Sequence, residues 1–135
     1  MGPLLYTISA NDLSLYADVD ASIVQYADDT QVLVTGAAGD IGSMVSTMEK
    51  NISELSHWFG KNDLKVNAAK TQLIVIGSRY NIKRLSPVTV NFMGAAVAGP
   101  PTVRNLGDVF DQSLTFSAHT DDVVRRCTGT LCGLA

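Results

Sequence analysis

Two adjacent carboxylates, Asp28 and Asp29, are the residues of this sequence whose type and spacing best suit a chemical reaction. The apolar runs Ile23-Val24 and Val32-Leu33-Val34 flank them, and this pattern predicts a β-hairpin that carries the acid pair in its turn. Neighbouring carboxylates on a stiff support repel each other, and a bound divalent cation relieves that repulsion. The pair therefore predicts a site for a hard metal ion, although Asp-Asp is also ordinary turn chemistry on a solvated loop.

The predicted hairpin that positions the acid pair occupies about residues 22–35. With Asp28 and Asp29 at the centre of the turn, Ala27 pairs with Thr30, and Tyr26 faces Gln31 across the strands. Nearly all other side chains on the two strands are apolar. We therefore expect the hairpin to be buried on both faces.

Composition limits the class of protein. The chain has 135 residues, of which 46% are hydrophobic and 17% charged, and this predicts one folded domain with a hydrophobic core. No apolar run is long enough to span a bilayer, and the start of the chain lacks the basic and apolar regions of a signal peptide. We therefore expect no membrane contact and an intracellular location, in the cytoplasm or the nucleus.

Charge is distributed unevenly along the chain. Residues 1–35 contain five aspartates and no lysine or arginine, whereas residues 61–104 contain seven basic residues and only one acid, Asp63. This asymmetry predicts a cation site in the first part and a phosphate-facing surface in the second. Solvation of loops and strand edges explains the basic residues equally well.

A glycine pattern offers a different function. Gly36, Gly39 and Gly42 follow a predicted strand and precede a predicted helix, and they resemble the glycine fingerprint of Rossmann-type, NAD(P)-binding short-chain dehydrogenases. Against this, the chain is too short to complete a doubly wound domain. Asp40, the expected N-cap of the helix, would also compete with the pyrophosphate for the helix N-terminus. A dinucleotide-binding domain stays open as an alternative.

The remaining elements follow from hydrophobic spacing. An amphipathic helix is predicted over 41–59, ended by Gly60, with an apolar stripe that covers one face of a sheet. A short helix over 3–15, a buried strand over 73–76, a hairpin over 88–97 that turns at Met93-Gly94, and a strand over 103–110 are also expected. Ser117 is expected to cap a final helix in which Val123, Val124, Cys127 and Leu131 share a face.

Several short motifs together resemble the reverse transcriptase (RNA-directed DNA polymerase) domain of non-LTR retrotransposons. Their order and spacing cover nearly the whole chain, and the aspartate pentad is the most specific of them. The matching pieces are Gly2-Pro3-Leu4-Leu5-Tyr6 with Asn11-Asp12-Leu13, Tyr26-Ala27-Asp28-Asp29-Thr30-Gln31, Leu64-Lys65-Val66-Asn67 with Lys70-Thr71, and Asn105-Leu106-Gly107 with Phe116-Ser117-Ala118-His119.

The resemblance implies an α+β fold, a partial polymerase palm whose antiparallel hairpin carries the Asp-Asp pair and packs on amphipathic helices. It implies one partial domain over 1–135, with the palm in about 1–77 and the end of the palm and start of the thumb in about 78–135. The reaction it implies is two-metal nucleotidyl transfer with Mg²⁺ or Mn²⁺. The implied partners are an RNA template, a DNA primer and deoxynucleoside triphosphates.

By the same resemblance, individual residues acquire roles. Asp28 is implied as a metal ligand and Asp29 as its weaker partner, while Tyr26 and Ala27 shape the primer terminus. Lys70 is implied as the group that protonates the leaving pyrophosphate, and Leu106 and Gly107 as the turn that grips the primer strand. Asp108 departs from the apolar residue expected after that glycine, which puts the local strand packing in doubt.

A second departure from the family concerns the first metal-binding aspartate, which in this family precedes the Gly-Pro-Leu-Leu helix. The chain begins after that point, so the remainder of the polymerase is expected to be missing and the isolated chain to be inactive. A non-catalytic remnant that binds nucleic acid through residues 61–104 is a further alternative.

Overall fold

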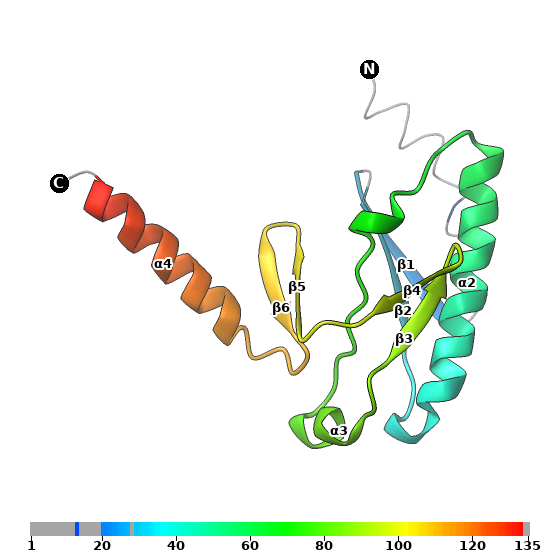
Figure 1. Ribbon diagram of the computed structural model, residues 1–135, viewed down its shortest axis with the longest axis horizontal. Coiled ribbons are helices and arrows are strands. Elements are labelled where there is room, and N and C mark those ends of the chain that lie inside the picture. The colour runs from blue at the N-terminus through cyan, green and yellow to red at the C-terminus, as the bar shows by residue number, and fades with distance from the viewer. Residues whose placement is uncertain (1–12, 14–19, 28, 134–135) are drawn as a thin grey trace. The chain divides into compact units, whose positions relative to one another are not determined.

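The computed structural model of the chain describes residues 13, 20–27 and 29–133, with the side chains of the last helix described up to residue 130. These residues form two compact units, which are treated separately below: Met1–Thr71 with Thr89–Val97, and Gln72–Val88 with Ala98–Ala135. Among the described residues, the strands form three two-stranded sheets, and helices accompany them. The mixed α+β class is confirmed (Figure 1).

The first hairpin consists of β1 (Ala21–Tyr26) and β2 (Asp29–Val34). The strands are antiparallel, as predicted, but the register differs, because Tyr26 pairs with Asp29 and Gln25 with Thr30. Two residues therefore separate the strands, and the described one, Ala27, has φ 53°. The predicted pairing of Ala27 with Thr30 is wrong, since Ala27 takes the first turn position and Asp29 already belongs to a strand.

Helix α2 (Ile41–Lys61) follows a short 3₁₀ turn, η2 (Ala38–Asp40). The predicted amphipathic helix is confirmed, but it continues through Gly60 and ends at Lys61, with Asn62 as the C-cap. Asp40 occupies the N-cap position without a capping hydrogen bond from its side chain. Asn51 is fully buried on the apolar stripe, and its Nδ2 donates to the carbonyl of Thr47 at 2.8 Å.

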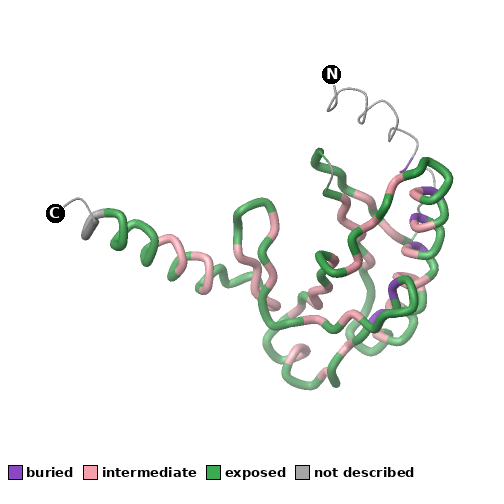
Figure 2. Tube along the Cα trace, turned by 45° about the horizontal axis from the view of Figure 1, so that its top comes forward, coloured by how far each residue is buried: buried purple, intermediate pink, exposed green. Residues whose placement is uncertain are grey.

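The core of the first unit lies where α2 faces the first hairpin. Leu13, Leu55 and Trp58 are buried there, and partly buried side chains surround them: Ile23, Val32, Phe59 and Leu64. Figure 2 shows that buried positions gather on α2 and on β3. Leu13 is the one described residue of the predicted 3–15 helix, and the rest of that prediction lies outside the described residues.

The opposite face of the first hairpin is exposed. Val24, Tyr26 and Leu33 keep 54%, 65% and 53% of their surface accessible. The expectation of burial on both faces is therefore wrong for the described residues. Helix α2 contacts both β1 and β2, and the residues that alternate away from it stay uncovered.

The second hairpin confirms the prediction for residues 88–97. It consists of β3 (Thr89–Phe92) and β4 (Ala95–Ala98), and it turns at Met93 (φ 51°) and Gly94 (φ 82°). Val90 and Phe92 are buried, and β3 contacts α2. The N–H of Asn91 donates to Glu49 Oε1 at 2.7 Å, which ties the strand to the helix.

The second unit begins with an extended segment. The predicted strand over 73–76 is wrong, because residues 71–78 pair with no strand in the described part of the chain. The N–H of Gly77 nevertheless donates to the carbonyl of Gln112 at 2.9 Å. A short helix that sequence spacing did not indicate, α3 (Arg79–Arg84), follows. Ser78 is its N-cap, and the Ser78 hydroxyl accepts from the N–H of Asn81.

Residues 103–110 form a hairpin rather than the single strand predicted. The strands are β5 (Thr102–Asn105) and β6 (Asp108–Asp111), and the chain reverses at Leu106 and Gly107. The last helix, α4 (Ser117–Gly133), packs against β6. Ser117 is its first residue and not its cap.

The face of α4 that was predicted to carry Val123, Val124, Cys127 and Leu131 is largely exposed in the described side chains. Val124 is 58% exposed and Cys127 is exposed, whereas Val123 is partly buried. Figure 2 shows the exposure along this helix. The side chain of Leu131 is not among the described ones, so this part of the shared-face prediction lies outside the described residues.

Candidate functional site

The tip of the first hairpin holds three of the predicted site residues together. Tyr26 and Asp29 are cross-strand partners, and Ala27 stands between them in the turn. Asp29 is exposed at the start of β2, and Tyr26 is 65% exposed beside it. Asp28, the fourth residue predicted here, lies outside the described residues. The described carboxylate, that of Asp29, is therefore open to solvent and accessible to a metal ion.

A buried hydroxyl lies next to this tip. Thr30 follows Asp29 in β2 and pairs with Gln25. Its Oγ1 is buried and has no hydrogen-bond partner among the described residues. Sequence reasoning did not single out this residue, because a threonine in a strand is common and its pattern carries no signal of an unpaired hydroxyl.

Lys70 ends a second 3₁₀ turn, η3 (Ala68–Lys70). Asn67 caps this turn, since its Oδ1 accepts from the N–H of Ala69 at 3.1 Å and its carbonyl accepts from the N–H of Lys70 at 3.0 Å. Lys70 is exposed. Among the described residues it forms no ion pair with Asp29, so the ammonium group is free to meet a ligand.

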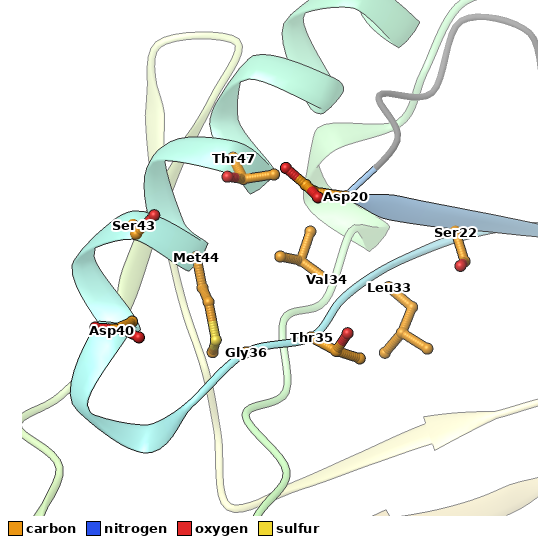
Figure 3. A pocket seen from close by; sticks show the side chains of 10 residues that line it. All are labelled: Asp20, Ser22, Leu33, Val34, Thr35, Gly36, Asp40, Ser43, Met44 and Thr47. Atoms are coloured by element: carbon orange, nitrogen blue, oxygen red, sulfur yellow. The ribbon is translucent and has the colours of Figure 1, made fainter.

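A polar cavity of about 340 Å³ lies in the first unit, beside the glycine pattern (Figure 3). Asp20, just before β1, and Asp40, at the start of α2, both line it, and none of the ten lining residues is a lysine or arginine. Two carboxylates without a cation disfavour a bound pyrophosphate. Gly36 has a packing reason, because a Cβ there would lie 2.6 Å from Met44 Sδ.

Leu106 and Gly107 belong to the second unit, where they form the turn between β5 and β6. Both have positive φ, 49° and 95°, and Leu106 is 51% exposed. Arg104 Nη1 donates to the carbonyl of Gly107 at 3.3 Å, which braces the turn. Asp108, the departure from the family pattern, lies at the exposed start of β6 with Oδ1 3.7 Å from His119 Nε2.

Two aspartates tie the third hairpin, formed by β5 and β6, to α4 and to the loop before that helix. Asp111 accepts hydrogen bonds from the N–H groups of Ser113, Thr115 and Phe116 and from the Thr115 hydroxyl. The Thr115 N–H is the largest cause of the lowered pKa of the Asp111 carboxyl, against a smaller opposing effect of desolvation. Sequence reasoning missed this residue, although Asp before a polar loop is a known capping signal.

Asp122 on α4 pairs with two arginines. Arg104 Nη2 lies 2.8 Å from Asp122 Oδ2, and Arg126 Nε lies 3.3 Å from the same oxygen. The hydrogen bond from Arg104 is the main cause that lowers the pKa of the Asp122 carboxyl. This pairing engages Arg104, which the charge pattern had assigned to a phosphate-facing surface.

The family model described as reverse transcriptase (RNA-dependent DNA polymerase) matches residues 1–123. The chain belongs to the reverse transcriptase family. The predicted family is therefore confirmed. Among curated proteins, a probable RNA-directed DNA polymerase from transposon X-element of Drosophila melanogaster is 27% identical over 131 residues. The match covers 93% of this chain and 14% of that protein, so the chain spans about one seventh of its relative. No solved structure matches.

The alternative of a dinucleotide-binding domain is not supported for this reverse transcriptase family member. β2 pairs antiparallel with β1, whereas the fingerprint requires a parallel βαβ unit. Gly39 and Gly42 have no heavy atom within 4 Å of an added Cβ, so no close approach explains them. In the part of the chain that the structure describes, no helix is both long and apolar enough to cross a bilayer.

Proposed function

We propose that this chain contributes to an RNA-directed DNA polymerase of a retrotransposon and carries part of its nucleotidyl-transfer site. The observation that carries the proposal is the family match over 123 residues, together with a hairpin whose tip presents an exposed Asp29 next to Tyr26. We assign about 1–77 to the palm and about 78–135 to the end of the palm and the start of the thumb. The intracellular location stays a prediction.

Asp28 and Asp29 are the residues that we propose to hold a divalent metal ion, Mg²⁺ or Mn²⁺. Carboxylate oxygens are the ligands that these hard ions prefer, and the exposed carboxylate of Asp29 at the start of β2 suits this chemistry. No group of three metal-ligating side chains is present among the described residues, which do not include Asp28. When bound, such an ion stabilises the negative charge that develops on transferring phosphoryl groups.

The other site residues act on the nucleic acid and the nucleotide. Tyr26 and Ala27 directly precede the acid pair and orient the primer terminus, for which a two-thirds exposed aromatic residue is well suited. Lys70 donates a proton to the leaving pyrophosphate, and its exposed ammonium group forms no ion pair within the described residues that would hold it back. Leu106 and Gly107 contact the primer strand. The partners that we propose are an RNA template, a DNA primer and deoxynucleoside triphosphates.

Paramagnetic Mn²⁺ tests the metal site. We expect Mn²⁺ to broaden the backbone amide NMR signals of residues 26–30 in the full chain, and Mg²⁺ in excess to restore them. Asp28→Asn should abolish this effect and Asp29→Asn should weaken it. Asp63→Asn is the matched control, because Asp63 is an exposed aspartate at φ 55° in another turn of the same unit and asparagine tolerates that conformation.

Broadening that survives Asp28→Asn, or that centres away from the hairpin, would contradict the proposed metal site. Circular dichroism of each variant separates loss of metal binding from loss of fold.

A further inference from the structure

Helix α3 presents four exposed residues that the proposed nucleotidyl-transfer site does not use: Arg79, Tyr80, Lys83 and Arg84. Positions four apart lie on the same side of a helix, so Arg79 and Lys83 share one side of α3 and Tyr80 and Arg84 share the adjacent one. Ile82, on another side, is half-buried, and its Cδ1 lies 3.5 Å from the place of a Cβ on Gly77. The helix is thus anchored on one side and leaves a basic and aromatic surface on the other.

The positive charge on this surface is not neutralised. Residues 72–88 contain no acid, and neither Arg79 nor Lys83 forms an ion pair within the described part of the chain. The second unit has four aspartates, of which Asp111 and Asp122 are engaged in the contacts described above and Asp108 lies near His119. Because most aspartates of this unit contact residues outside α3, the surface of α3 keeps a net positive charge that a separate molecule can bind.

Tyr80 and Arg84 form a preassembled pair. The Arg84 guanidinium carbon lies 5.0 Å from the centroid of the Tyr80 ring, and Arg84 Nη1 donates to the Tyr80 hydroxyl. The ring is nevertheless 66% exposed. A guanidinium that holds an aromatic ring in place lowers the entropy that the ring loses when a second flat group stacks on it.

We propose that α3 is a docking surface for single-stranded nucleic acid, in which Arg79 and Lys83 contact phosphates and Tyr80 stacks against an unpaired base. Nucleic acid as the polyanion rests on the proposed function, whereas the surface itself rests on charge and exposure. Aromatic rings beside cations bind single strands, since a duplex keeps its bases stacked on each other. An acidic protein would use the cations and leave the ring without a partner.

Fluorescence anisotropy of a labelled oligouridylate with the full chain tests this surface, in EDTA and across a series of NaCl concentrations. Lys83→Gln and Arg79→Gln should each reduce the slope of log K against log salt by about 0.7, the value for one phosphate contact on a single strand. Tyr80→Ala should weaken binding by about 5- to 150-fold, the range for loss of one stacked base. Tyr80→Phe keeps the ring and should retain most of the affinity.

Arg125→Gln is the matched control, because Arg125 is an exposed arginine of the same unit on α4. The proposal is overturned if Arg125→Gln weakens binding as much as Lys83→Gln, if Tyr80→Ala binds like the parent chain, or if polyglutamate or a duplex competes better than the single strand. EDTA removes any divalent ion from the candidate metal site, so binding measured in its presence separates this outcome from failure of the metal site. Mn²⁺ binding without α3-dependent oligonucleotide binding refutes only the docking surface.

Discussion

Replacement of Thr30 by valine should stabilise the first unit, even though it removes a polar group beside the candidate metal site. The Thr30 hydroxyl is buried without a partner among the described residues. A buried hydroxyl that makes no hydrogen bond costs about 1–3 kcal/mol. Valine keeps the branched shape that suits a strand and lacks this cost. We therefore expect the free energy of unfolding to rise by about 1–2 kcal/mol.

Urea unfolding followed by the fluorescence of Trp58 measures this change, because Trp58 is the single tryptophan and is buried in the same unit. With an m-value of about 1–3 kcal/mol/M, the midpoint should rise by roughly 0.3–2 M. Thr89→Val is the control, since Thr89 is an exposed strand residue of that unit and its replacement should change stability by less than about 0.5 kcal/mol.

A Thr30→Val chain that is no more stable than the parent, with Thr89→Val unchanged, would refute this reasoning. It would mean that the hydroxyl has a partner in solution that offsets its burial. Thr30→Ser sharpens the comparison, because serine keeps the hydroxyl and loses only the methyl group. It should be less stable than the parent whichever result valine gives.

Three further outcomes are expected. Hydrogen bonds lower the pKa of Asp111 in the fold below its ordinary 3.8, so the stability that its carboxylate contributes is present above that value and is lost as the pH falls through the folded pKa. Thermal unfolding from neutral to strongly acid pH should show this loss of stability. Asp111→Asn should make the stability depend less on pH. Gly42→Ala, in the first turn of α2, should stabilise by about 0.5–1 kcal/mol in urea unfolding, whereas a dinucleotide fingerprint would require the glycine. Asp28→Gly should raise the urea midpoint and abolish the broadening of the amide signals of residues 26–30 by Mn²⁺. A lower urea midpoint would contradict this prediction.

Local patterns predicted the fold where one rule decided the outcome. The apolar stripe of α2 and the Met93-Gly94 turn were both found as expected, because helical periodicity and glycine at positive φ leave few alternatives. The strand expected over 73–76 failed, since its β-branched run has no partner strand in the described residues and pairing depends on tertiary contacts. The burial of Asn51 could not be predicted from hydrophobic spacing either, because it depends on a hydrogen bond within the helix.

Sequence patterns nominated the candidate site residues, whose roles stay predictions, but they did not predict the register of the hairpin that carries them. Placing both acids in the turn assumed that the most turn-prone pair takes the centre, whereas Ala27 takes the first turn position and Asp29 pairs with Tyr26. The α3 surface was missed because six residues are too few for periodicity to show. Its signals were the Ser78 cap and the spacing of Tyr80 and Arg84, which become informative once the helix is known.

The three hairpins explain why the acid pair stands out. Two residues connect the paired strands of each hairpin, and the first of them is in the left-handed region: Ala27, Met93 and Leu106, at φ 53°, 51° and 49°. In the second and third hairpins glycine follows, at φ 82° and 95°, as this type of turn prefers. In the first hairpin the corresponding residue is Asp28.

The chain thus uses the most stable turn residue twice and forgoes it at the one turn where a second carboxylate adjoins Asp29. Two neighbouring acids at a tight turn lower stability through their mutual repulsion, and a glycine would remove it. A local preference that is followed elsewhere and broken at one place is the mark of a position held for function. If this residue had been selected for stability alone, Asp28→Gly would change the stability of the fold and leave Mn²⁺ binding unchanged. The Mn²⁺ broadening of that variant therefore distinguishes a metal ligand from a residue that serves only the hairpin.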